Sequence, residues 1–191
     1  EDAAVNSYLM EAEGIYTGYR YYETRYADMV MGNGGEQASA GTYTAADGTA
    51  ATVDGKWNYA NEVVYPFGYG LSYTSYSYSP VTLSSSTMKA GGKVTATATV
   101  TNTGSRDGDE IVQFYIRDRY SNIVRPVKEL KGFQRVHLAK GESKAVTFDI
   151  DSATLSYYDN DGKAVLEPGD FDIMIGANSA NVQSAKLTLT K

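Results

Sequence analysis

The sequence predicts a mainly β protein, in which a two-sheet antiparallel β-sandwich follows an irregular, partly helical segment. Short apolar runs with a period of two recur from Val94 to the C-terminus. Polar turn dipeptides separate these runs, and no long helical pattern interrupts them. About seven short alternating strands between polar turns are typical of a sandwich of about 100 residues. We therefore place a sandwich domain at residues 80–191.

A helix is predicted near the N-terminus, because apolar and aromatic residues spaced by four, three and four share one helical face, at Ile15, Tyr19, Tyr22 and Tyr26. Gly14 and Gly18 weaken it, since each interior glycine costs about 1 kcal/mol relative to alanine. The helix therefore depends on tertiary contacts.

Residues 32–56 are rich in Gly, Ala, Ser and Thr and contain the turn dipeptides Asp47-Gly48 and Asp54-Gly55. Such a composition offers little apolar surface to bury. We expect a flexible insertion, with one weak hairpin as the alternative to a plain loop.

The stretch from Val64 to Thr74 mounts aromatic rings on a backbone shaped by Pro66, Gly68 and Gly70. Proline fixes φ and removes a donor, whereas glycine allows angles closed to other residues. We expect a sharply bent strand whose rings are packed, so that the stretch docks against neighbouring structure.

Four aromatic residues around this bend are candidate substrate-binding residues, because flat rings offer stacking faces to sugars: Trp57, Tyr59, Tyr69 and Tyr73. Core packing against a neighbouring domain is the competing interpretation and the one we favour.

Strands follow in order along the rest of the chain. Tyr76 and Tyr78 form an edge-like strand that Pro80 ends. From Val94 to Val100 small apolar residues alternate with threonines, so one face points inward. Inward positions of the alternating runs predict a core of Val100, Val112, Phe114, Ile116, Val146, Phe148, Phe171, Ile173 and Leu187. A further apolar group is expected at Leu130, Phe133, Val136 and Leu138.

Composition excludes several classes of function. The net charge is −6 and no basic stripe is visible, which argues against a nucleic-acid partner. No apolar run approaches the ~20 residues of a membrane span, so no membrane partner is predicted. The chain has no cysteine, hence no disulfide or thiolate site, and its localisation stays open between cytoplasm and export.

No catalytic constellation is visible. The one histidine, His137, lies in a strand-like run and is interpreted as a half-exposed strand residue. The run Asp159-Asn160-Asp161-Gly162 resembles the start of a calcium loop, but Asp170 stands where the closing Glu belongs, so a hairpin turn explains it better. We predict no metal and no cofactor. Many carboxyl groups are present, but nothing in the sequence selects a pair for acid/base chemistry.

Several motifs resemble glycoside hydrolase family three enzymes, chiefly β-glucosidases. The runs from Tyr8 to Glu23 and from Tyr65 to Thr74 resemble the end of that family's second catalytic domain. The runs from Thr101 to Glu110, from Arg125 to Phe133 and from Glu167 to Phe171 look like its fibronectin type III-like domain, of immunoglobulin-like fold. The resemblance thus implies that residues 1–79 end the preceding catalytic α/β domain and residues 80–191 form the fibronectin type III-like sandwich.

The resemblance also implies a parent enzyme that hydrolyses terminal β-glycosides with retention, using an Asp nucleophile on a barrel domain and a Glu acid/base. Neither motif occurs here, so no catalytic residue is assigned and the chain alone is expected to be inactive. Since it begins at Glu1, we expect a piece of a longer polypeptide. Its expected partners are the missing catalytic domains and, through them, a β-glycoside or oligosaccharide. The leading hypothesis is a non-catalytic region that braces those domains. A carbohydrate-binding module and an adhesion-type sandwich are the alternatives.

Overall fold

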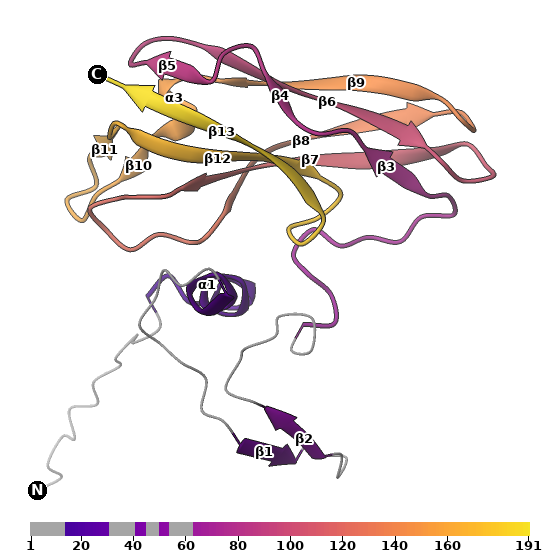
Figure 1. The fold of residues 1–191 in the computed structure, drawn as a ribbon, viewed down its shortest axis with the longest axis horizontal. Helices are drawn as coiled ribbons and strands as arrows, with labels where there is room; N and C mark the ends of the chain where they lie inside the picture. The colour runs from indigo at the N-terminus through magenta and orange to yellow at the C-terminus, as the bar shows by residue number, and fades with distance from the viewer. Residues whose placement is uncertain (1–13, 31–40, 45–49, 54–62) are drawn as a thin grey trace, which may run out of the picture. The chain divides into compact units, whose positions relative to one another are not determined.

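The computed structural model describes residues 14–30, 41–44, 50–53 and 63–191 (Figure 1). The chain divides into two compact units, Glu1–Trp57 and Asn58–Lys191. Within the described ranges, no helix is both long and apolar enough to cross a bilayer.

The described part of the first unit contains α1 (Tyr19–Val30) and an antiparallel pair formed by β1 (Gly41–Thr44) and β2 (Ala50–Val53). The helix begins later than the aromatic spacing predicts. Gly18 has φ of +58°, a left-handed conformation that an α-helix cannot contain, so Ile15 lies outside. The β1–β2 pair is the hairpin weighed for the glycine-rich insertion. The rest of that insertion, with Trp57 and Tyr59, lies outside the described residues, so its predicted flexibility stays a prediction.

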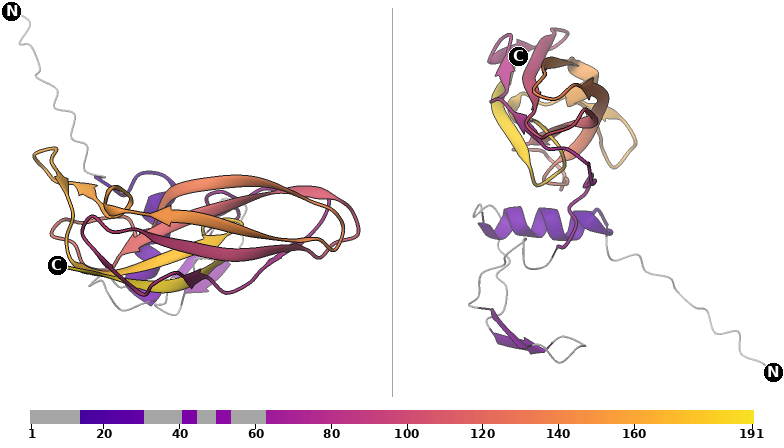
Figure 2. Two further views of the ribbon diagram at one scale, coloured as in Figure 1. Left: turned by 90° about the horizontal axis from the view of Figure 1, so that it is seen from above. Right: turned by 90° about the vertical axis from the view of Figure 1, so that its right-hand side faces the viewer.

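The second unit is a sandwich of two sheets, seen as two layers in Figures 1 and 2. One sheet has five strands in the order β5 (Thr87–Lys89), β13 (Val182–Thr190), β12 (Gly169–Gly176), β7 (Gly108–Asp118) and β8 (Glu129–Leu138). All its pairings are antiparallel except that of β13 with β5. The other sheet is built on β6 (Val94–Asn102), which pairs with β3 (Tyr76–Tyr78), β4 (Thr82–Leu83) and β9 (Ser143–Ile150). After β9 come the short helix α3 (Ser152–Leu155) and a hairpin of β10 (Tyr157–Tyr158) with β11 (Ala164–Val165). The predicted mainly β sandwich is confirmed.

The predicted core is confirmed at all nine positions, each of which is buried. Along β6 every second residue, from Val94 to Val100, is buried while the intervening threonines are partly exposed. Phe114 of one sheet and Phe148 of the other stack with ring centroids 4.9 Å apart. The two inner faces therefore meet through the residues that period-two alternation selected.

The apolar group predicted on β8 is only half buried. Val136 and Leu138 join the core, but Leu130 is 36% exposed and Phe133 is 66% exposed. Phe133 is three residues from the inward Val136 and faces outward by alternation, and a register shift in the β7–β8 pairing turns Leu130 outward as well. Leu130 lies opposite Tyr115 and Gly132 opposite Phe114, so Lys131 is an extra residue without a partner on β7. Such a bulge shifts the alternation by one residue, so the four apolar residues of this group do not share one buried face.

Strand β3 lies on the N-terminal side of the division predicted at residue 79. It pairs with β6, with Tyr78 opposite Val100, and is therefore a strand of the sandwich. The assignment of residues 1–79 to a preceding domain stays a prediction, but this strand packs with the sandwich core.

Candidate functional site

The segment from Val64 to Thr74 is irregular rather than a bent strand, so that part of the expectation is wrong. The amide of Tyr69 donates to the carbonyl of Pro66 at 3.0 Å, which closes a tight turn. Gly68 lies within this turn at φ +77°. Proline and a left-handed glycine together favour a turn over a continuous strand, because neither suits a sheet ladder.

Gln113 holds this turn against the outer face of the five-stranded sheet. Its side-chain nitrogen donates to the carbonyl oxygens of Gly68 at 2.8 Å and Ala177 at 2.7 Å. Its side-chain oxygen accepts a hydrogen bond from the hydroxyl of Tyr115. Both the nitrogen and the oxygen of this buried side-chain amide are therefore hydrogen-bonded. These bonds fix the turn to strand β7 and to the β12–β13 connection.

The Phe67 ring lies on the same face, with its centroid 6.4 Å from that of Tyr115 in an edge-to-face arrangement. Phe67 also accepts a backbone hydrogen bond from Ser179 at 2.9 Å, and Lys128 in the β7–β8 loop donates to the Ser179 carbonyl at 2.6 Å. Tyr115 is fully buried although its neighbours Phe114 and Ile116 point into the core. Three separate loops thus meet over the outer face of β7. We name these contacts of Phe67, Gly68, Gln113, Tyr115 and Ser179 the segment clamp.

The other rings of the segment are not packed as predicted. Tyr65 is 69% exposed and Tyr73 is 96% exposed. Tyr65 and Tyr69 lie together, with ring centroids 5.0 Å apart and planes inclined by 41°. Of the four candidate sugar-stacking residues, Tyr69 and Tyr73 are therefore exposed, while Trp57 and Tyr59 fall outside the described residues.

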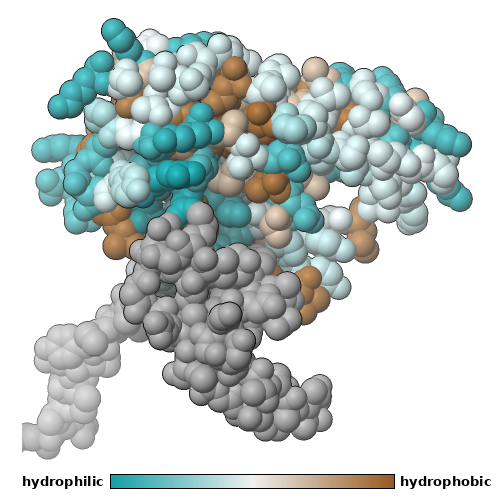
Figure 3. Space-filling model, in the orientation of Figure 1, coloured by the Kyte–Doolittle hydropathy of each residue, from teal (hydrophilic) through white to brown (hydrophobic). Residues whose placement is uncertain are grey.

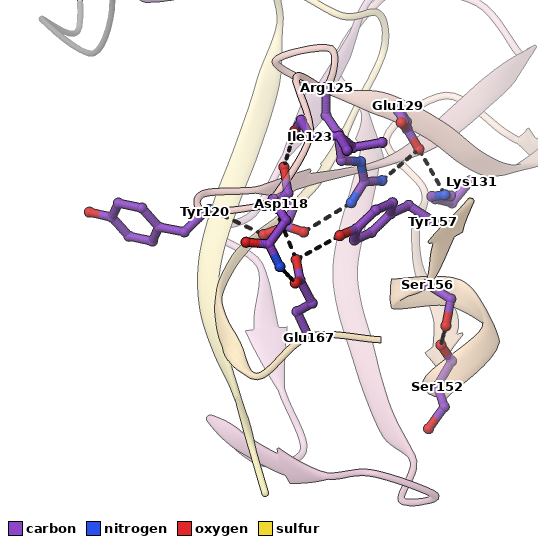
Figure 4. Close-up of polar contacts among 12 residues, drawn as sticks. Asp118, Tyr120, Ile123, Arg125, Glu129, Lys131, Ser152, Ser156, Tyr157 and Glu167 are labelled. Atoms are coloured by element: carbon purple, nitrogen blue, oxygen red, sulfur yellow. Dashed lines mark hydrogen bonds and ion pairs between the residues drawn. The ribbon is translucent and has the colours of Figure 1, made fainter. Parts of the chain in front are cut away.

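A second cluster lies in the loop between β7 and β8 and is drawn in Figure 4. The Arg125 guanidinium bridges two carboxylates, at 3.0 Å from Asp118 and 3.1 Å from Glu129. Lys131 adds a contact of 2.8 Å to Glu129. Asp118 and Arg125 are only 3% and 9% exposed in their side chains. The guanidinium therefore neutralises a carboxylate that is shielded from water.

The two carboxylates respond differently to this environment. Burial raises the pKa of Asp118 and outweighs the amide of Tyr120 and the charge of Arg125, which act in the opposite direction. At Glu129 burial also opposes ionisation, but Lys131 and Arg125 together outweigh it, so the pKa of Glu129 is lowered.

The same network reaches the β10–β11 hairpin. The hydroxyl of Tyr157 donates to Glu167 at 2.7 Å, and Asn122 in the loop also bonds Glu167. Arg125 lies over the Tyr157 ring, with 4.9 Å from its guanidinium carbon to the centroid. Cation–π contact and hydrogen bonds therefore tie this loop to the hairpin that follows α3.

Glycoside hydrolysis uses two carboxyl groups, one protonated and one ionised, and the raised pKa of Asp118 beside the lowered pKa of Glu129 resembles such a pair. Here, however, the Arg125 guanidinium lies between Asp118 and Glu129 and bonds both, so it fills the space that a sugar and its scissile bond would need. The arrangement is suited to holding a loop in place.

The remaining candidates are also structural. His137 is an exposed residue of strand β8, and its Nδ1 lies 2.9 Å from the Asp109 carboxylate. This is a surface contact between neighbouring strands. Asp159 accepts hydrogen bonds from the amides of Asp161 and Lys163 and closes the turn of the β10–β11 hairpin, as predicted. Among the described residues, no group of three or more His, Asp or Glu side chains could hold a metal ion.

Sequence reasoning missed Gln113 and Tyr115. Both occupy outward positions of β7, between the buried Val112, Phe114 and Ile116, where alternation predicts solvent exposure. A weak signal was present, since five successive residues from Val112 to Ile116 include only one strongly polar side chain. A strand that reads as apolar on both faces is one that another segment covers.

Comparisons with known proteins agree with this architecture. Residues 110–179 match the family described as fibronectin type III-like domain. The chain is 48% identical over 130 residues to a periplasmic beta-glucosidase of Salmonella typhimurium, a match that covers 68% of the chain and 17% of that protein. It is 40% identical over 137 residues to a beta-xylosidase of Formosa agariphila, covering 71% of the chain and 19% of that protein. The chain thus spans about a fifth of the length of these curated relatives.

A solved beta-glucosidase structure is similar to a larger part of the chain. The GH3 beta-glucosidase of Bifidobacterium adolescentis has a TM-score of 0.67 and 31% identity, with 93% of this chain and 21% of that protein covered. The likeness extends beyond the sandwich strands into the N-terminal part of the chain.

Proposed function

Because the chain belongs to the fibronectin type III-like region of glycoside hydrolase family three, we propose that it braces the catalytic domains of a larger β-glycosidase without itself carrying catalytic groups. The parent enzyme hydrolyses terminal β-glycosides with retention of configuration. Its β-glycoside or oligosaccharide substrate binds to the catalytic domains, which are the partners of this chain. Relatives named for β-glucosidase and β-xylosidase activity support the reaction class.

The segment clamp is the observation that carries this proposal. It joins the polypeptide that enters the sandwich to the outer face of β7 through the turn at Gly68 and the buried Gln113 amide. A buried, hydrogen-bonded amide makes the connection rigid, and a flexible tether between domains has no need of such rigidity. The entering segment and the sandwich therefore move as one body, as a brace between domains requires.

The test compares the 191-residue chain with the parent enzyme. We expect the purified chain to release no aryl alcohol from an aryl β-glucoside. We expect deletion of residues 76–191, which removes the whole sandwich including β3, to lower the temperature at which the catalytic domains of the parent unfold. Turnover by the purified chain would contradict the non-catalytic assignment. Unchanged unfolding of the truncated parent would contradict bracing.

Exposed tyrosines favour carbohydrate binding as a second candidate function. Tyr65 and Tyr69 present a ring pair, and Tyr73 is almost fully exposed. Aromatic rings in such positions stack on sugar faces. Retention of the chain on insoluble glucan, lost in Tyr73→Ala and kept in Tyr158→Ala, would establish this function, and absence of retention would leave the brace alone.

A further inference from the structure

The outer face of the five-stranded sheet carries an exposed apolar strip on its edge. Ile111 of β7 and Leu130 and Phe133 of β8 are all exposed hydrophobic residues. Leu130 pairs with Tyr115 and Phe133 with Gln113, whose side chains lie on the outward face. Ile111 is two residues from Gln113 and so lies on that face as well. We call these three residues the edge strip.

The bulge at Lys131 adds Leu130 to the strip. Residues 130 and 133 differ by an odd number, so regular alternation would place one of them inward. Phe133 faces outward in the regular part of the pairing, and the extra residue turns Leu130 outward beside it and leaves Gly132 on the inward side, opposite Phe114. A Cβ at Gly132 would already be in contact with the Phe148 ring at 3.6 Å. Gly132 therefore lies on the core side of β8, while Leu130 and Phe133 lie on the outer face.

Charged side chains border the strip and are already paired. Arg135 contacts Asp109 at 2.6 Å, and His137 lies 2.9 Å from the same carboxylate. These pairs are exposed, so they contribute little to stability. An apolar centre with a paired polar border is the pattern of a protein interface rather than of a solvated sheet face.

The strip is continuous with a face that is already covered. Phe133 is the cross-strand neighbour of Gln113, the residue that holds the segment clamp. Polypeptide arriving through the clamp therefore enters the sandwich beside the strip. About four-fifths of the related GH3 enzyme lies outside the part that this chain matches. A catalytic part joined covalently to the sandwich meets this face at a higher effective concentration than a free partner does, so it is the occupant that we favour.

We infer that the edge strip is the surface on which the catalytic part of the parent enzyme packs, with Phe133 at its centre. This inference rests on the proposed bracing function and names the face that performs it. A large apolar side chain that becomes buried between two domains contributes to their association through the area removed from water.

The test uses Phe133→Asp and, as a matched control, Tyr158→Asp. Tyr158 is also an exposed aromatic but belongs to the separate β10–β11 hairpin. Each change is made in the parent enzyme and in the 191-residue chain, and thermal unfolding and hydrogen exchange of β8 are measured. We expect Phe133→Asp to lower the unfolding temperature of the parent by several degrees and to speed exchange in β8. Tyr158→Asp should have neither effect, and neither change should shift the unfolding temperature of the isolated chain.

Equal unfolding temperatures for the two variants of the parent would overturn the inference. If deletion of residues 76–191 destabilises the parent while Phe133→Asp does not, bracing stands and this face is wrong. If deletion has no effect, the proposed function itself fails. Sedimentation of the isolated chain supplies a further outcome, because a dimer that Phe133→Asp dissolves would assign the strip to a second copy and overturn the inference.

Discussion

The side-chain amide of Gln113 donates a 2.8 Å hydrogen bond to the carbonyl oxygen of Gly68, 45 residues earlier in the chain. The contact requires a residue without a Cβ at position 68. Its φ is +77°, and a Cβ there would overlap the Gln113 side chain. Two independent requirements therefore select glycine at this position.

We expect Gly68→Ala to destabilise the sandwich unit through both requirements. The left-handed backbone alone costs about 1–2 kcal/mol for a residue with a Cβ, and the overlap with Gln113 adds to it. Gly141→Ala measures the backbone cost alone, because Gly141 also has φ +77° but has open space around it. Gly70→Ala is a control with neither a left-handed backbone nor an overlap. Chemical denaturation should rank the losses as Gly68, then Gly141, then Gly70. Equal losses at Gly68 and Gly141 would show that the Gln113 contact does not constrain the turn.

Phe148→Ala should cost about 3–5 kcal/mol of unfolding free energy, because it removes a buried ring and leaves a cavity. Phe148 stacks on Phe114 across the two sheets and is buried. Phe133→Ala in the isolated chain is the control, since that ring is exposed. A loss well under 1 kcal/mol for Phe148→Ala in urea denaturation would contradict the packing of Phe148 between the two sheets.

Arg125→Met should be strongly destabilising, by about 3–5 kcal/mol, because it leaves the buried Asp118 carboxylate without its partner. The matched control is Arg119→Met, which removes an ion pair with Asp172 in which the arginine is exposed. Such a pair is worth about 0–1 kcal/mol. Denaturation midpoints measured for both variants check the difference, and similar losses would show that Asp118 finds another partner or reaches water.

Glu110→Gln should change the pH dependence of stability. Burial raises the pKa of Glu110 above its ordinary 4.5, although the Tyr78 hydroxyl that donates to it at 2.8 Å acts in the opposite direction. A carboxyl with a raised folded-state pKa binds its proton more tightly when folded. Its contribution to stability is therefore full below pH 4.5 and is lost as pH rises through the folded-state pKa.

Glutamine keeps an acceptor for Tyr78 without the charge. The stability of Glu110→Gln relative to the wild type should therefore increase as pH rises from below 4.5 to neutrality. Asp149→Asn supplies a control of opposite sign, because hydrogen bonds from Lys93 and Thr95 lower the pKa of Asp149. Asp149→Asn should lose stability relative to the wild type as pH rises through the range in which Asp149 ionises. Parallel pH profiles for wild type and Glu110→Gln would contradict the raised pKa.

The strands and the core could be predicted from the sequence because a buried sheet face leaves a period of two in the chain. Val94 to Val100 on β6 and Phe171 and Ile173 on β12 are buried as that period requires. The same rule does not hold across the Lys131 bulge, where the pairing shifts by one residue. At Pro66 to Tyr69 the proline and glycines predicted a bent strand, and the structure has a tight turn. Local composition indicated a turn or bend but not its geometry.

The sequence by itself determined which residues alternate inward, and hence the sandwich, while the resemblance of its motifs indicated the family. Both signals depend only on near neighbours along the chain. Only the tertiary structure decided that Gln113 bonds Gly68, that Arg125 bridges Asp118 and Glu129, and that Leu130 and Phe133 share an exposed face. Those outcomes depend on which loops of the folded sandwich meet and on a single inserted residue in one strand. A one-residue shift in pairing reverses the face of every side chain beyond it, and no local pattern records where that shift occurs.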